Sequence, residues 1–143
     1  MIFSLSDHIE QIKAGTKTQT RRPNNRYKTG QTYAVQPGRG KKGIPEGRIY
    51  VAEVIREWKP DLTKIPEHAH FARSWAAMDS GYPIRGYQAK AEGGYSPFVF
   101  EELYEKMYPG WTERYAVWFS FFTEATLLEC GYNMKGEKIN AKN

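Results

Sequence analysis

The sequence has 143 residues, 40% of them hydrophobic and 15% aromatic, and a formal net charge of +5. A chain of this length builds one sizeable hydrophobic core but not two, which predicts a single domain over residues 1–130 and a polar C-terminal tail over 131–143. Residues 1–48 carry ten Lys and Arg against three Asp and Glu, whereas the remainder carries 11 against 13. This local basic excess favours a polyanionic partner such as RNA, DNA or a nucleotide; a charged face that only aids solubility is the alternative.

The number of cysteines and the hydropathy of the sequence indicate in which cellular compartment the protein is expected. The single cysteine, Cys130, excludes an internal disulfide and cannot make a zinc site on its own. The first residues lack the basic start, apolar stretch and cleavage site of a secretion signal, and no apolar run is long enough to span a membrane. We therefore expect a cytoplasmic protein without membrane association, and the sequence leaves its oligomeric state open.

The first half of the chain predicts one helix followed by extended segments. Ser6 or Asp7 can cap a short helix, with Glu10 as the capping-box partner and Gly15 at its end. The next elements are an extended segment over 17–22, a strand over 32–35, a loop rich in Gly, Pro and Lys over 36–47, and a strand over 49–55.

The second half predicts two helices and two closing strands. A helix opens at Pro66, and the helical spacing of Phe71, Trp75 and Met78 predicts that these side chains lie in the core. The next elements are a surface loop over 79–94, a helix that starts at Ser96-Pro97 and ends at Pro109-Gly110, a strand over 115–122 and a further strand over 125–130. This order predicts an α+β fold built on a small, mostly antiparallel β-barrel with flanking helices.

The segment Gly15–Arg22 concentrates the clearest chemical signal, because one lysine, three threonines and two arginines follow the first helix within eight residues. An alcohol becomes a useful nucleophile when a neighbouring base takes its proton, and Lys17 lies three residues before Thr20. Side chains at this spacing point to opposite faces of a straight strand, so the two meet only if the chain bends between them. Arg21 and Arg22 favour a phosphate or nucleic acid at this segment.

Other polar motifs are less informative. The loop from Gly38 to Gly43 lacks the spacing and the Ser or Thr of a Walker A motif, so it does not predict nucleotide hydrolysis, although its basic residues can lie along a phosphate backbone. His68 and His70 have no further ligand pattern, and we expect no metal site. Glu92 lies in a predicted loop, where it either points into a pocket or remains a solvated acid.

Four segments together resemble the ASCH domain of the PUA-like superfamily, and the match spans roughly residues 2–122. They are residues 12–22, residues 27–30, residues 91–93 and residues 100–119. The stretch from Gln36 to Lys41 is similar to the form found in phage-type members. The resemblance implies a small β-barrel with flanking helices and a cleft for RNA or modified nucleosides.

Within that superfamily the chain is similar to the small bacterial N(4)-acetylcytidine amidohydrolases, which use a lysine, a threonine and a glutamate. By motif position these residues fall on Lys17, Thr20 and Glu92. The resemblance implies that Lys17 takes the proton of Thr20, that the threonine oxygen attacks the acyl carbon, and that Glu92 protonates the departing amine, with no cofactor or metal. The residues expected to hold substrate or phosphate are Thr18, Arg21, Arg22, Arg39 and Lys41. Two alternatives stay open, a non-catalytic RNA-binding module and a metal-independent ribonuclease.

Overall fold

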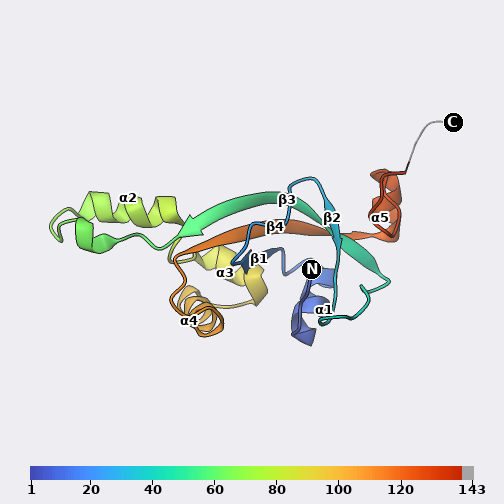
Figure 1. Cartoon of the computed structure of the whole chain (residues 1–143), viewed down its shortest axis with the longest axis horizontal. Coiled ribbons are helices and arrows are strands. Elements are labelled where there is room, and N and C mark those ends of the chain that lie inside the picture. The colour runs from blue at the N-terminus through green and yellow to red at the C-terminus, as the bar shows by residue number, and fades with distance from the viewer. Residues whose placement is uncertain (140–143) are drawn as a thin grey trace. The chain divides into compact units, whose positions relative to one another are not determined.

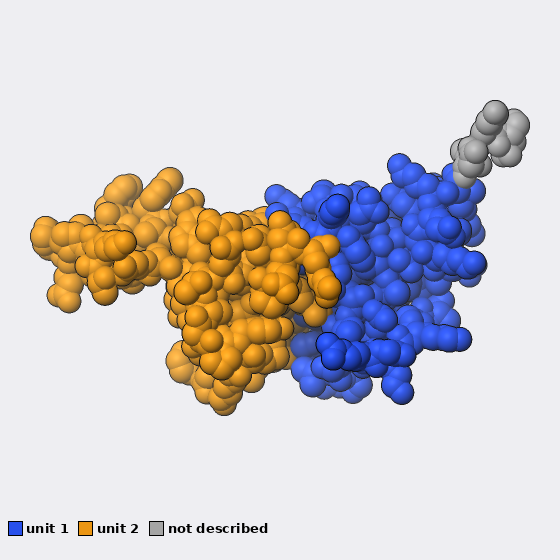
Figure 2. All heavy atoms as spheres, in the orientation of Figure 1, with its two compact units in different colours: residues 1–18, 27–54, 117–143 blue, residues 19–26, 55–116 orange. Residues whose placement is uncertain are grey.

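Two long strands, β3 (Gly47–Trp58) and β4 (Glu113–Thr123), each pass from one compact unit of the chain into the other. The computed structural model describes residues 1–139. Within this part, unit 1 comprises residues 1–18, 27–54 and 117–139, and unit 2 comprises residues 19–26 and 55–116 (Figure 2).

The described strands form one four-stranded antiparallel sheet in the order β1-β4-β3-β2, with β1 at Gln19–Arg22 and β2 at Thr32–Ala34 (Figure 1). In the antiparallel β2–β3 pair, Thr32 lies opposite Tyr50 and Ala34 opposite Arg48. Strands and helices both occur, as predicted, but the predicted closed barrel is wrong for this part of the chain. Closure requires the two edge strands to pair, and in the described sheet β1 and β2 lie at opposite edges and do not pair with each other.

In unit 1, α1 (Ser6–Ala14) follows the predicted pattern and buries Ile9 and Ile12. It ends at Gly15, whose φ of +79° is the left-handed conformation that glycine adopts without strain. The predicted side-chain cap is not formed, because Leu5 occupies the N-cap position. The core that α1 covers consists of Met1, Phe3, Ile9, Ile12, Val35, Ile49, Val51, Val117 and Phe119.

The strand predicted over 125–130 is a helix, α5 (Glu124–Glu129). The Thr123 side chain accepts a hydrogen bond from the N–H of Thr126 at 3.3 Å, which satisfies a helix-terminal donor and starts the helix. In the predicted tail, Tyr132 pairs with Lys138 in an isolated bridge and donates its hydroxyl hydrogen to the Gly30 carbonyl at 3.3 Å. Tail residues 140–143 lie outside the described part of the chain.

In unit 2, the helix predicted from Pro66 begins later, as α2 (His70–Ser80), after a short 3-10 helix η1 (Leu62–Lys64). The prediction that its apolar residues lie in the core is wrong: Phe71 is 82% exposed, Trp75 62% and Met78 56%. These residues do lie on a helix, as their spacing predicted, but no other described element covers that face of α2. Phe71 and Trp75 pack against each other, with ring centroids 6.4 Å apart.

The loop predicted over 79–94 contains a third helix, α3 (Gly86–Gly93), whose start is fixed by the Gln88 side chain accepting the N–H of Arg85 at 3.1 Å. The next helix, α4 (Pro97–Met107), begins as predicted, with Ser96 accepting the N–H of Val99. The core of unit 2 lies around these helices and comprises Ile84, Ala89, Phe100, Tyr104 and Trp111.

Candidate functional site

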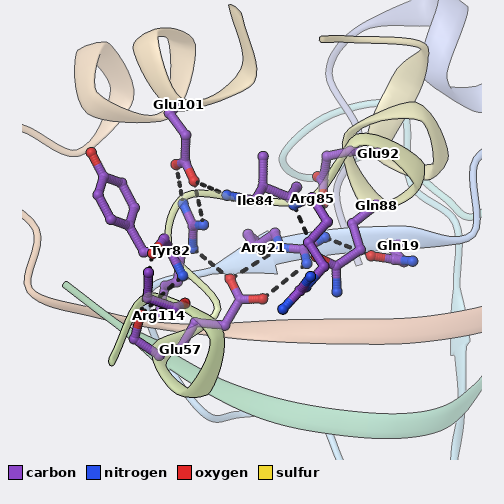
Figure 3. A network of polar contacts seen from close by, with 12 residues as sticks. Gln19, Arg21, Glu57, Tyr82, Ile84, Arg85, Gln88, Glu92, Glu101 and Arg114 are labelled. Carbon is purple, nitrogen blue, oxygen red and sulfur yellow. Dashed lines mark hydrogen bonds and ion pairs between the residues drawn. The ribbon is translucent and has the colours of Figure 1, made fainter. Parts of the chain in front are cut away.

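Unit 2 buries a cluster of charged side chains supplied by three strands and two helices, and Figure 3 shows how these side chains point toward one another. The charged cluster consists of Arg21 from β1, Glu57 from the end of β3, Glu92 from α3, Glu101 from α4 and Arg114 from the start of β4. Both arginine side chains are fully buried, and the three carboxylates are nearly so.

Arg21 joins two carboxylates in the charged cluster. Its Nε and Nη2 donate to the two oxygens of Glu57 at 3.2 and 2.9 Å, and its Nη1 donates to Glu92 Oε2 at 2.9 Å and to Gln19 Oε1 at 2.7 Å. The guanidinium fork and a carboxylate match in geometry, so this pairing fixes direction as well as distance. Arg21 therefore sets the position of Glu92 relative to β1.

Arg114 makes a second set of paired hydrogen bonds. Its Nη1 and Nη2 donate to the oxygens of Glu101 at 2.6 and 2.8 Å, and its Nε donates to Glu57 Oε1 at 2.7 Å. Its guanidinium carbon also lies 4.3 Å from the centroid of the Trp111 ring. Glu57 is thus shared between both arginines and holds the two halves of the cluster together.

The pKa values in and beside the charged cluster follow from burial and charge. Burial alone would lower the pKa of Arg21, but the carboxylates of Glu92 and Glu57 outweigh it and raise that pKa. Burial is the main cause that raises the pKa of Tyr104, against the opposing effect of Arg114. The Tyr104 hydroxyl has no hydrogen-bond partner among the described residues and stays protonated at neutral pH.

Three predicted catalytic residues are almost completely buried: Lys17 is 2% exposed, and Thr20 and Glu92 are each 5% exposed. Lys17 belongs to unit 1, where its Nζ lies 5.8 Å from the centroid of the Phe3 ring. Thr20 and Glu92 belong to unit 2. Thr20 Oγ1 accepts the Nε–H of Arg22 at 3.2 Å. Glu92 lies in the last turn of α3, so its predicted place in a loop is wrong.

The predicted binding residues differ in exposure. Thr18 and Arg22 are half-buried, Arg39 and Lys41 are exposed, and Arg21 is inside the charged cluster. Among residues 1–139, no three His, Cys, Asp or Glu side chains come together as a metal site would require. None of the helices described is both long and apolar enough to cross a bilayer.

Sequence reasoning missed Glu57, Glu101 and Arg114, and two of these carried a signal. Along β3, Glu57 lies an even number of residues from the buried Ile49 and Val51, so the alternation of a strand places it on the same face. Along β4, Arg114 lies two residues from the buried Ala116, on the same face. A charged residue on the inward face of a strand indicates a buried partner. The partner itself was not visible, because Arg21 precedes Glu57 by 36 residues.

Comparison with known proteins gives one structural likeness. Neither a protein family nor a curated protein matches the sequence. The chain is similar to the crystal structure of a mutant of ZmASCH, a protein from Zymomonas mobilis, with a TM-score of 0.44 and 14% sequence identity, over 90% of this chain and 78% of that one. The resemblance to the ASCH domain remains a prediction from the sequence motifs.

Proposed function

We propose that this protein is an amidohydrolase that acts on N(4)-acylated cytidine or a related modified nucleoside, with Lys17, Thr20 and Glu92 as its catalytic residues. The observation that supports the proposal most is their burial, between 2% and 5% exposed. Burial removes the hydration of a charged side chain, and for Glu92 the ion pair with Arg21 compensates this loss and holds the carboxylate in place.

The proposed reaction is an acyl transfer followed by hydrolysis. Neutral Lys17 takes the hydroxyl proton of Thr20 as the threonine oxygen bonds to the acyl carbon and the carbonyl electrons move to its oxygen. Collapse of this intermediate breaks the bond to N4, which takes up a proton from Glu92 and leaves as the amine of cytidine. Water then hydrolyses the threonine ester, which releases the carboxylate and restores the hydroxyl.

The ion pair with Arg21 refines the role of Glu92. This contact is made by the carboxylate form, with Nη1 and Oε2 2.9 Å apart. To protonate a leaving amine, Glu92 must first receive a proton. The available proton is the one that Lys17 took from Thr20 in the first step, and in the proposed reaction the Lys17 ammonium gives it to Glu92 and becomes neutral again. In this proposal Glu92 relays that proton, while Arg21 positions the carboxylate.

The test is release of cytidine from N(4)-acetylcytidine, followed by chromatography. Thr20→Val keeps the branched shape and removes the hydroxyl, so we expect no detectable turnover; Lys17→Met should lower kcat by about 10³-fold. Thr16→Val is the matched control, because Thr16 is exposed and its hydroxyl donates to the Gln11 carbonyl in its own unit, at 3.2 Å. It should keep wild-type activity. A wild-type protein inactive on a panel of acylated nucleosides would overturn the proposal.

A second candidate, an RNA-binding module without chemistry, is favoured by the exposure of Arg39, Lys41 and Lys42 in one glycine-containing loop. Basic side chains on a flexible surface loop contact phosphates without reading sequence. Retention of RNA by a protein that turns over no acylated nucleoside would support this candidate. Cleavage of the RNA in the absence of added metal would instead support the ribonuclease alternative.

A further inference from the structure

Unit 2 contains a cavity of about 490 Å³ that borders the charged cluster, because Glu101 is one of its lining residues. Its apolar walls are aromatic: Tyr82 follows α2, Phe98 lies on α4 and Trp111 precedes β4. The rings of Tyr82 and Trp111 meet at 71° with centroids 5.6 Å apart, so they present differently oriented faces. Its volume is in the range of small-molecule binding sites. The lining combines these three aromatic residues with five charged ones, Lys59, Glu101, Glu102, Glu105 and Lys106.

The chain places one of its own ammonium groups against these walls. Lys59 Nζ lies 4.8 Å from the Trp111 ring centroid and 5.8 Å from that of Tyr82. It also donates to Glu105 Oε2 at 2.9 Å. An ammonium group over aromatic faces is attracted by their negative π-electron density, and here a carboxylate adds a directed hydrogen bond.

Hydrogen bonds keep the Glu105 carboxylate ionised and fix its orientation. Its other oxygen, Oε1, accepts the backbone N–H of Gly110 at 2.9 Å, which fixes the carboxylate at the end of α4. The Gly110 hydrogen bond, followed by that from Lys59, lowers the pKa of Glu105. The carboxylate therefore stays ionised and oriented when Lys59 moves away.

We propose that this cavity binds the head group of a primary alkylammonium ligand, which replaces the ammonium of Lys59 against Trp111, Tyr82 and Glu105. The Lys59 side chain is 31% exposed and that of Glu105 46%. Half-exposed ion pairs add little stability, so Lys59 can turn into solvent at small cost. The ligand is a primary amine because it takes the place of the primary ammonium of Lys59, and one of its N–H hydrogens is donated to Glu105 as that of Lys59 is. A fully methylated ammonium has no such hydrogen. This inference is independent of the proposed amidohydrolase activity.

The experiment measures binding of n-butylammonium by calorimetry. Lys59→Met keeps the apolar part of the side chain and removes its ammonium group, which competes with the ligand for the same position. The Kd of this variant for n-butylammonium should therefore be at least about tenfold lower than that of the wild type. Adding Glu105→Gln to that variant should raise the Kd about tenfold, because the anion is lost. Adding Glu102→Gln instead is the matched control: Glu102 lines the same cavity but pairs with Lys106, at 3.7 Å, and its loss should leave the Kd nearly unchanged.

Further measurements separate the possible outcomes. Tetramethylammonium should bind more weakly than n-butylammonium, and equal binding would contradict the role of the Glu105 hydrogen bond. An acetylated, amidated lysine distinguishes a lysine side chain of a partner from a free amine: tighter binding than n-butylammonium would identify the partner source. In the wild type, saturating n-butylammonium should shift the Lys59 Hε resonances away from the Trp111 ring current. No binding to either protein, or binding unaffected by Glu105→Gln, would overturn the proposal.

Discussion

Arg114 shows how much a single side chain contributes in unit 2. It is fully buried and donates to both Glu57 and Glu101. Arg114→Met keeps most of the side-chain volume but leaves those buried carboxylates without their shared cation, so we expect a loss of about 3–5 kcal/mol in the free energy of unfolding. Urea denaturation followed by circular dichroism measures it.

The matched control is Arg56→Met. Arg56 pairs with Glu113 at 3.0 Å, but this pair is exposed to solvent, and its loss should cost about 0–1 kcal/mol. Equal losses in the two variants would contradict the view that burial makes the charged cluster structurally important.

For individual residues, the sequence identified candidate catalytic side chains but not the side chains that contact them. It selected Lys17, Thr20 and Glu92 from motif position, and all three are buried. It could not see that Arg21 pairs with Glu92, because 71 residues separate them and only the packing of α3 on β1 brings them together.

Two helix ends were predictable from the local sequence, although the predicted cap of α1 and the predicted start of α2 were wrong. Ser96 before Pro97, and Gly15 after α1, act through hydrogen bonds and backbone conformations within a few residues, and both occur as predicted. Burial was less predictable, because helical spacing of apolar residues defines a face without showing what covers it. α2 has such a face, yet it stays uncovered in the described structure.

The exposure of α2 predicts a small effect for Trp75→Ala. Trp75 is 62% exposed, whereas Trp111 is 8% exposed and packs in the core of unit 2. We expect Trp75→Ala to change the free energy of unfolding by less than about 0.5 kcal/mol. The same substitution at Trp111 should cost about 3–5 kcal/mol. Chemical denaturation of both variants provides the comparison; a large loss at Trp75 would show that α2 is covered in solution.

At the scale of the whole molecule, the uneven distribution of charge is a property that sequence establishes directly. The sequence does not establish the fold in the same direct way, because strand lengths and register depend on contacts between distant segments. Four of the predicted extended segments form the sheet, but the one predicted over 125–130 is a helix. The edge strands β1 and β2 do not pair with each other in the described sheet, and composition carries no signal for that. Charge, in contrast, needs no contact to act, because its field extends about 10 Å at ordinary ionic strength.

The basic excess of residues 1–48 therefore predicts how RNA binding should depend on salt. Lys41 and Lys42 are both exposed, and each phosphate they neutralise releases a counterion. We expect Lys41→Gln with Lys42→Gln to reduce the slope of log K against log salt for single-stranded RNA by about 1.4. Lys64→Gln with Lys90→Gln removes the same charge from exposed positions outside the basic third, and it should leave the slope nearly unchanged. Fluorescence anisotropy at several salt concentrations measures both slopes. Equal changes in the two variants would mean that net charge, rather than the loop from Gly38 to Gly43, attracts the RNA.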